Sequence, residues 1–283
     1  MKTRLITKED IDAVLLLLCE GFPRRDRAYW TEALRHLDQR PEVEGYPKYG
    51  FLIEDQGAVQ GVMLILTADL GPGFVGRLRS NLSSWYVREP WRKYAIFMLR
   101  AGLKVKGGCY TDLSPAPQVV QINASLGLVP YTGGSILLDP RAALGGGGQV
   151  EFWDGQSDAG LAAKLEPALK EVARRHIGYG CTALLLASPS GAQLSLYRIK
   201  RLKRVIPAAR FVYGEPALLV ASAGALMRAL LARGIPLAQI DAPQGMQPRV
   251  GRLMPARDIR YVTGGEPPLA GDLLETEIAV FGP

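Results

Sequence analysis

Apolar residues in the first half of the chain recur at the spacings of alternating helices and strands. Thr7, with an acidic residue three positions on, has the outline of a capping box, so we predict a helix after it. The apolar stripe of that helix is Ile11, Val14, Leu15 and Leu18. Further predicted helices cover 27–37, 91–104 and 118–126, and predicted strands cover 4–6, 51–54, 59–66, 82–87, 109–113 and 131–138.

The second half repeats parts of the first half in the same order. Residues 51–60, an apolar strand followed by a turn with Gly-Ala, resemble residues 185–194. Residues 129–134 resemble residues 260–265, and the matching pieces lie 131 to 134 positions apart. We infer a tandem duplication.

A glycine run separates the two copies. Gly145 to Gly148 are four consecutive glycines, which favour neither helix nor strand. We place a linker at 141–149 and predict two domains, 1–140 and 150–283. A length of 283 residues agrees with two domains of ordinary size.

Composition indicates a folded globular protein. Hydrophobic residues make up 48% and charged residues 22% of the chain, and no apolar stretch of 18 residues occurs. The apolar run that ends at Cys19 follows the acidic residues Glu9, Asp10 and Asp12, which argues against a signal peptide. Three distant cysteines and two histidines favour buried thiols over a metal site. We expect a cytoplasmic protein without a metal or a membrane partner.

The chain has a net charge of +7, and its densest basic run is Arg198 to Arg204. Apolar residues at alternating positions around it predict the exposed end of a long hairpin. Binding to a polyanion is the alternative interpretation. Tyr197 is the one aromatic residue beside the run, which argues against a surface for single-stranded nucleic acid.

Two segments could bind phosphate groups. Gly71 to Gly76 has the spacing of a dinucleotide-binding loop, but no helical pattern follows it, so we interpret it as a loop between strands. In the second segment a strand ends before Pro90, and Arg92 stands where a helix begins. A helix N-terminus offers unpaired N–H groups and a positive dipole end, and Arg92 adds a charged fork. An ordinary surface turn is the alternative.

The order of elements over residues 4–138 and two motifs resemble the GNAT acyltransferase superfamily. The first motif, 87–95, is similar to V-x-P-x-x-R-G-x-G-x-G/A, with Pro90, Trp91 and Arg92 at the proline, aromatic and arginine positions. The second, Asn-Ala-Ser-Leu-Gly-Leu at 123–128, is similar to a helix that ends in L-G-F. The resemblance implies an α/β fold of the α+β type. Each of two GNAT-like domains would have a mixed, mostly antiparallel sheet flanked by helices.

The resemblance also implies a co-substrate, acetyl-CoA or another acyl-CoA. Its binding residues would be Tyr86, Val87, Arg92, Lys93, Tyr94, Ala95 and Asn123. The sequence departs from the family at Lys93, Tyr94 and Ala95, where the family has glycines that let backbone amides approach the pyrophosphate.

In the resembling family an amine attacks the thioester directly, and a backbone N–H of the fourth strand donates to the thioester carbonyl. A proton acceptor is then needed, and Asp112 and Tyr131 are our candidates, with a turn cap and a core residue as the respective alternatives. Asp272, Glu275 and Glu277 could face an amine, or they could be exposed carboxylates on a terminal hairpin.

We therefore predict an acyl-CoA-dependent N-acyltransferase, most simply an acetyltransferase, that acts on a small-molecule or peptide amine. The second half would be a degenerate copy without its own CoA. Two alternatives stay open. A Fem-type aminoacyl-tRNA-dependent ligase would use tRNA as its partner, and the basic run favours it. A non-catalytic binding or scaffold protein is favoured by the lost glycines. The sequence leaves the acceptor, the acyl length and the oligomeric state open.

Overall fold

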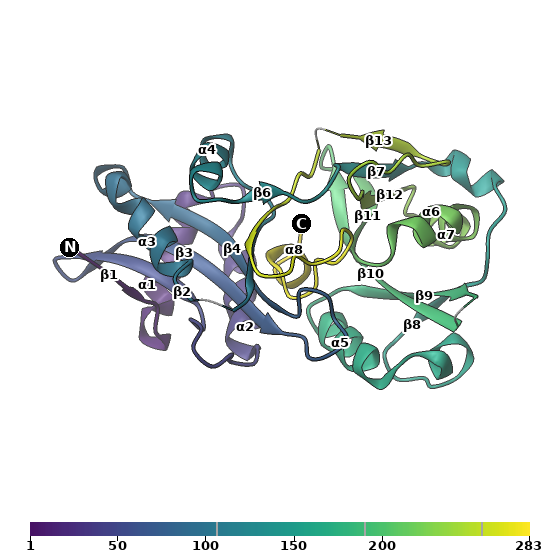
Figure 1. Ribbon diagram of the computed structural model, residues 1–283, viewed down its shortest axis with the longest axis horizontal. Helices are drawn as coiled ribbons and strands as arrows, with labels where there is room; N and C mark the ends of the chain where they lie inside the picture. The colour runs from purple at the N-terminus through teal and green to yellow at the C-terminus, as the bar shows by residue number, and fades with distance from the viewer. Residues whose placement is uncertain (106, 190, 256) are drawn as a thin grey trace. The chain divides into compact units, whose positions relative to one another are not determined.

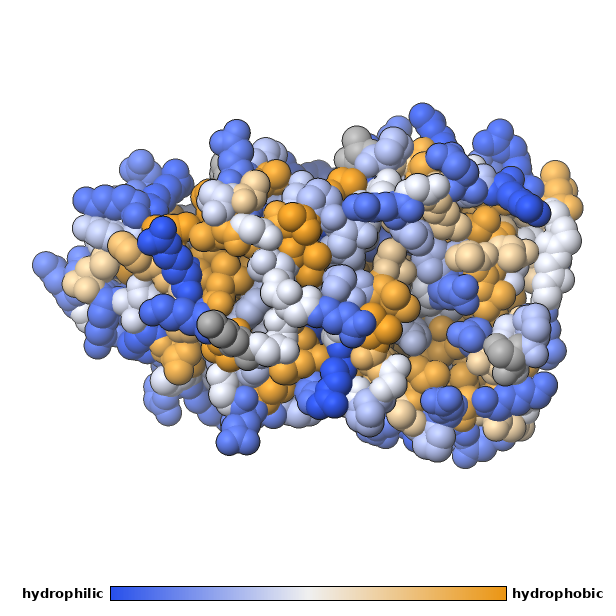
Figure 2. All heavy atoms as spheres, in the orientation of Figure 1, coloured by the Kyte–Doolittle hydropathy of each residue, from blue (hydrophilic) through white to orange (hydrophobic). Residues whose placement is uncertain are grey.

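A computed structural model describes residues 1–105, 107–189, 191–255 and 257–283, and the chain divides into two compact units (Figure 1). Unit 1 comprises Met1–Val129, Tyr261–Pro267 and Glu275–Phe281. Unit 2 comprises Pro130–Arg260, Pro268–Leu274 and Gly282–Pro283. On the face shown in Figure 2, hydrophilic side chains are spread widely, and hydrophobic residues form small groups among these hydrophilic side chains.

The sheet of unit 1 is mixed and mostly antiparallel, as the sequence predicts. Its strand order is β1-β2-β3-β4-β5-β14-β6. The pair β4–β5 is parallel, and the pairs β1–β2, β2–β3, β3–β4 and β5–β14 are antiparallel. The bounds are β1 Lys2–Leu5, β2 Gly50–Asp55, β3 Ala58–Asp69, β4 Leu78–Val87, β5 Cys109–Asp112, β6 Val129–Pro130 and β14 Tyr261–Gly264.

Helices cover both faces of this sheet. Ile53, Met63 and Leu82 point from the strands into a core with α3, and the intervening residues point to the other face, where α1 contacts β3 and β4. The capping box of Thr7 and Asp10 is confirmed. The helices are η1 Lys8–Asp10, α1 Ile11–Gly21, α2 Arg27–Gln39, η2 Glu89–Tyr94, α3 Ala95–Gly102, α4 Pro117–Ser125 and α8 Glu277–Val280.

Unit 2 repeats this arrangement, with strand order β13-β7-β12-β11-β10-β9-β8 and one parallel pair, β11–β12. Its core lies between the sheet and the helices α6 and α7. The strands are β7 Ser135–Leu138, β8 Val150–Trp153, β9 Thr182–Ser188, β10 Gly191–Leu202, β11 Ile206–Tyr213, β12 Leu237–Asp241 and β13 Arg252–Met254. The helices are η3 Pro140–Leu144, η4 Gly160–Lys164, α5 Pro167–Gly178, α6 Pro216–Ala221 and α7 Ala223–Leu231.

Each sheet contains one strand from the other half of the sequence. β7 pairs with β12 in unit 2, where Ser135 lies opposite Asp241. β14 pairs with β5 in unit 1, where Tyr261 lies opposite Asp112. The domain boundary predicted at 141–149 comes from the sequence repeat. The compact units are instead defined by these strand pairings, and the chain first passes from unit 1 to unit 2 between Val129 and Pro130.

Several predicted elements have different bounds in the structure. The strand predicted at 82–87 begins at Leu78, because the polar residues Arg79 and Asn81 are buried in it. The helix predicted at 91–104 is a 3-10 turn followed by α3, and the strand predicted at 131–138 is limited to β7. Part of the predicted linker is helical, since 140–144 form η3.

Two negative findings apply to the described ranges of the chain. No helix there is long and apolar enough to cross a membrane. No group of three histidine, cysteine, aspartate or glutamate side chains is placed there to hold a metal ion.

Candidate functional site

The strands β4 and β5 part at their carboxyl ends. They pair in parallel from Arg79 opposite Cys109 to Leu82 opposite Asp112. β5 then ends, while β4 continues to Val87. In sheets with parallel strands, ligands bind beyond the carboxyl ends of the strands, where neighbouring chain segments separate. We therefore build the candidate site around this divergence.

A β-bulge lies in β4 directly after the divergence. Val62 of β3 is opposite Tyr86, but Leu64 is opposite Ser83, so Ser84 and Trp85 share one position on β3. Ser84 has a φ of 51°, the left-handed conformation found at some bulges. A bulge leaves backbone groups outside the ladder of hydrogen bonds. The bulge therefore interrupts the ladder next to the point where the strands part.

Glu277 connects the two diverging strands. Its carboxylate accepts a hydrogen bond from Oγ of Ser83 on β4 and one of 2.5 Å from Oγ of Ser114, two residues after β5. Its backbone N–H donates to Oδ1 of Asn81 at 2.7 Å. The half-buried carboxylate of Glu277 is therefore held beside the divergence.

A buried ion pair fixes the segment that carries Glu277. Nε of Arg40 lies 2.9 Å from Oε2 of Glu275, and these side chains are 3% and 2% exposed. Arg40 also donates to the carbonyl of Thr67, at 3.0 Å. His36 contacts the carbonyl of Val280 through Nδ1, at 3.0 Å. The interpretation of a terminal hairpin with exposed carboxylates is wrong, because Asp272 and Glu275 are buried and Glu277 begins a helix.

The structure brings two predicted site residues together. Nδ2 of Asn123 on α4 donates to Oδ2 of Asp112 at 2.7 Å. Both side chains are buried, and Asp112 ends β5 at the divergence. Asp112 is thus fixed by Asn123 and in turn orients the amide of that residue.

Three buried polar atoms of this region have no hydrogen-bond partner within the part of the chain that the structure describes. They are Nε1 of Trp85, Oγ1 of Thr111 and Oδ1 of Asn123. They belong to β4, β5 and α4, the elements around the divergence. A buried polar atom without a partner costs about 1–3 kcal/mol, and native proteins pair nearly all of them. A ligand that reached these atoms would supply the missing partners.

Tyr86 and Val87, at the end of β4, are held by protein contacts. The hydroxyl of Tyr86 donates to Oε1 of Glu20 on α1 at 3.0 Å, and Nη2 of Arg88 lies 2.6 Å from Oε2 of that carboxylate. Burial and the hydrogen bond to Glu20 raise the pKa of Tyr86, whereas the hydrogen bond from Arg88 lowers the pKa of Glu20. Val87 is part of the core under α3.

The turn after β4 presents cationic side chains. Arg92 and Lys93 are exposed, and Nε of Arg92 donates to the carbonyl of Val87 at 3.4 Å. Nζ of Lys93 lies 5.1 Å from the ring centroid of Tyr94. The turn is a 3-10 helix, followed by Ala95 at the start of α3. Lys93, Tyr94 and Ala95 carry Cβ atoms, which hinder a close approach of a phosphate group to the backbone amides. The groups that could bind a phosphate here are therefore the side chains of Arg92 and Lys93.

Tyr131 belongs to unit 2, whereas the other predicted site residues belong to unit 1. Its backbone N–H donates to the carbonyl of Arg260 at 2.9 Å, and its side chain is half-buried. The structure therefore does not bring Tyr131 into the unit that contains Asp112.

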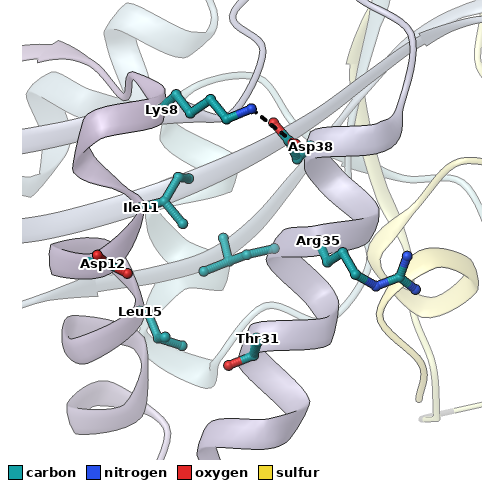
Figure 3. Close-up of a pocket in the computed structure, with 8 residues that line it drawn as sticks. Lys8, Ile11, Asp12, Leu15, Thr31, Arg35 and Asp38 are labelled. Atoms are coloured by element: carbon teal, nitrogen blue, oxygen red, sulfur yellow. Dashed lines mark ion pairs between the residues drawn. The ribbon is translucent and has the colours of Figure 1, made fainter.

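A groove of about 360 Å³ lies between α1 and α2 (Figure 3). Its floor is apolar, and Nζ of Lys8 lies 3.7 Å from Oδ2 of Asp38 across its rim. None of the predicted site residues lines it, so we do not place the functional site there. The lining residues are Lys8, Ile11, Asp12, Leu15, Thr31, Leu34, Arg35 and Asp38.

No protein-family model matches the sequence, and no curated protein matches it. Solved structures do match the fold. A proposed acetyltransferase from Pyrococcus horikoshii aligns with 99% of this chain and 92% of its own, at a TM-score of 0.56 and 12% identity. GCN5-related N-acetyltransferases from Anabaena variabilis and Kribbella flavida each align with 92% of this chain, and with 72% and 71% of their own. Their TM-scores are 0.57 and 0.55, and their identities 12% and 14%.

These likenesses extend over nearly the whole chain and show that it has the tandem GNAT-like fold. The fold expected from the motifs at 87–95 and 123–128 is thereby confirmed. The site residues stay predictions, since at these identities the likeness concerns the fold alone.

Proposed function

We propose that the chain is an acyl-CoA-dependent N-acyltransferase, with acetyl as the first acyl group to test. The acceptor is the amine of a small molecule or a peptide. One observation carries the proposal: buried, unpartnered polar atoms of Trp85, Thr111 and Asn123 flank the divergence of β4 and β5. A purely structural sheet gains nothing from leaving these atoms unpaired.

The acyl-CoA co-substrate supplies an activated thioester carbonyl, and the chain supplies positions and charges around it. The bulged backbone at Ser84 offers an N–H donor for a carbonyl oxygen, as an oxyanion hole does. The side chains of Arg92 and Lys93 offer positive charge to phosphate groups. Asn123 presents a buried acceptor that Asp112 holds in place.

Glu277 is the proton acceptor in this proposal. Its carboxylate attracts the acceptor as an ammonium group and takes a proton from it, and the neutral nitrogen then forms the N–C bond while the C–S bond of the thioester breaks and CoA leaves as a thiolate. Ser83 and Ser114 hold the carboxylate from both strands, so little reorganisation is needed. We assign Asp112 the task of orienting Asn123, and Tyr131 stays an untested candidate.

A second function is favoured by a specific observation. Lys93, Tyr94 and Ala95 replace the glycines of the resembling family, and the turn is a 3-10 helix. If this turn excludes phosphates, the protein is a binding or scaffold module without catalysis. The two functions differ in whether the protein binds and consumes an acyl-CoA.

The first experiment is calorimetry with acetyl-CoA and free CoA on the wild type and on Arg92→Ala. Micromolar binding that Arg92→Ala weakens supports the acyltransferase. No heat up to millimolar ligand overturns it and favours the binding module.

The second experiment measures thioester consumption with a panel of amines. We expect Glu277→Gln to lower kcat by about 10²- to 10⁴-fold, because a general base contributes about that much. The thermal unfolding temperature should not change. Glu44→Gln, at an exposed carboxylate of the same unit, is the matched control. Full activity of Glu277→Gln would remove Glu277 from the mechanism.

A further inference from the structure

The tip of the hairpin formed by β10 and β11, residues 199–206, exposes apolar side chains that have no role in the proposed reaction. Val205 is 68% exposed, Ile199 43% and Ile206 38%. About two thirds of the surface of Val205 is therefore exposed to water. Val205 lies in the turn and Ile206 directly after it, opposite Leu202, whereas Ile199 lies three residues before Leu202 on the other face of the hairpin.

Cationic side chains accompany these apolar residues in the sequence of the tip. Arg201, Lys203 and Arg204 are exposed at the same tip. The sequence has no aspartate or glutamate between Glu171 and Glu215, so no acidic residue of this segment offsets them. The hairpin end predicted from the basic run is confirmed, and it combines positive charge with exposed aliphatic carbon.

The turn itself holds the cations in a costly conformation. Lys203 and Arg204 have φ values of 49° and 68°, and the N–H of Val205 donates to the carbonyl of Leu202 at 3.1 Å. Two positive φ angles in sequence define a type I′ turn, for which Asn-Gly is the favoured pair. Lysine and arginine are disfavoured there. Stability alone does not explain them.

We propose that this tip docks the protein on the surface of an anionic lipid bilayer. Cations attract acidic headgroups, and adjacent aliphatic side chains enter the boundary between headgroups and acyl chains. A nucleic acid fits the tip less well, since residues 199–206 include no aromatic side chain to stack on bases and Tyr197 is buried. The contact is peripheral and does not depend on the proposed acyl transfer.

Co-sedimentation with vesicles tests the proposal. The vesicles contain phosphatidylcholine alone or phosphatidylcholine mixed with phosphatidylglycerol. We expect the wild type to co-sediment with the anionic vesicles and not with the neutral ones. At about fivefold per cation, Arg201→Gln/Lys203→Gln/Arg204→Gln should lose roughly 100-fold in partitioning. Val205→Asn should lose a smaller factor, because it removes apolar contact and keeps the charge.

Two further variants keep the result interpretable. Lys164→Gln/Arg249→Gln/Arg252→Gln removes three exposed cations of unit 2 outside the tip and is expected to bind like the wild type. Lys203→Asn/Arg204→Gly installs the favoured turn, so it should be at least as stable as the wild type. It should nevertheless bind anionic vesicles more weakly than the wild type, because it lacks two of the cations. An equal loss in the control triple, or no binding of the wild type to anionic vesicles, overturns the proposal. Tip-dependent binding of tRNA without vesicle binding overturns it as well, in favour of a nucleic acid.

Discussion

The two units share a fold but differ in chemistry on the sheet face opposite α3 and α7. In unit 1 this face of the parallel pair carries Asn81 and Thr111, which are neutral, and Oγ1 of Thr111 has no hydrogen-bond partner among the described residues. In unit 2 it carries Arg210 and Asp241, which form an ion pair with side chains 1% and 0% exposed. Nε of Arg260 lies 3.3 Å from the same carboxylate. Unit 2 thus carries a buried ion pair on the face where unit 1 carries neutral side chains, one of them with an unpartnered hydroxyl.

The turn after β4 in unit 1 and the turn after β11 in unit 2 also differ in charge. After β4 the turn carries the cations Arg92 and Lys93. After β11, Glu215 is the N-cap residue of α6, so a negative charge stands where an anion would bind. A Cβ on Gly214 would lie 2.6 Å from Oγ of Ser195, which shows how closely this turn is packed. One copy of a duplicated fold can become a structural partner by satisfying its own polar groups, which supports our expectation of a degenerate second half.

The largest expected effect concerns the buried carboxylate of unit 2. Asp241→Asn removes the carboxylate that pairs with the buried guanidinium groups of Arg210 and Arg260, and should lower the free energy of unfolding by about 3–5 kcal/mol. Urea unfolding followed by circular dichroism measures it. Asp69→Asn breaks the exposed pair with Arg77 in unit 1 and should cost less than about 1 kcal/mol. Equal losses would contradict the contrast between the units.

Two threonine variants should change the free energy of unfolding by smaller amounts and in opposite directions. Thr111→Val removes an unpartnered hydroxyl and should stabilise unit 1 by about 1 kcal/mol. It should also weaken acetyl-CoA binding by a factor of about 2–10 if the hydroxyl contacts the ligand. Thr132→Val in unit 2 removes the acceptor for the N–H of Arg260, at 3.0 Å, and should destabilise by about 1–3 kcal/mol. Thermal unfolding of both variants decides the signs.

The smallest expected effect is a dependence on pH in unit 2. Burial raises the pKa of Asp258, but the charges of Arg210, Arg260 and Lys200 outweigh burial, so the folded-state pKa lies below 3.8. The stabilisation from this group is therefore present above pH 3.8 and is lost as the pH falls through the folded pKa. Asp258→Asn should flatten the acid limb of stability against pH by less than about 1 kcal/mol, measured by urea unfolding. Asparagine suits this position, whose φ is 56°. An unchanged acid limb would show that Asp258 is not involved.

Local pattern predicted much of the fold. The capping box at Thr7, the helix at 118–126 and the turn between β2 and β3 follow from neighbouring residues and appear nearly where expected. In unit 2 the 3-10 turn Gly160–Lys164 ends before Pro167, and α5 begins at that proline. Short-range rules suffice where short-range contacts determine the conformation.

The candidate site could be predicted only in part. Asp112 and Asn123 lie close together in sequence, and their contact follows from a strand and the helix after it. The place of Glu277 depends on a strand and a helix that join a sheet built by residues much earlier in the chain. Glu275 was also open to interpretation as exposed, because its partner Arg40 comes from distant α2. Periodicity carries no information on such long-range pairing.

The exchange of β7 and β14 between the sheets has a consequence for the timing of synthesis. When β1 to β5 have left the ribosome, their sheet still lacks β14, and the segment that carries Glu277 has not been made. Unit 2, apart from short final segments, is translated before the site in unit 1 can be completed. A nascent chain stalled before residue 261 therefore has an unpaired edge on β5, open to wrong partners. The candidate site therefore lies in the part of the chain that is synthesised first, but it is completed only near the end of synthesis.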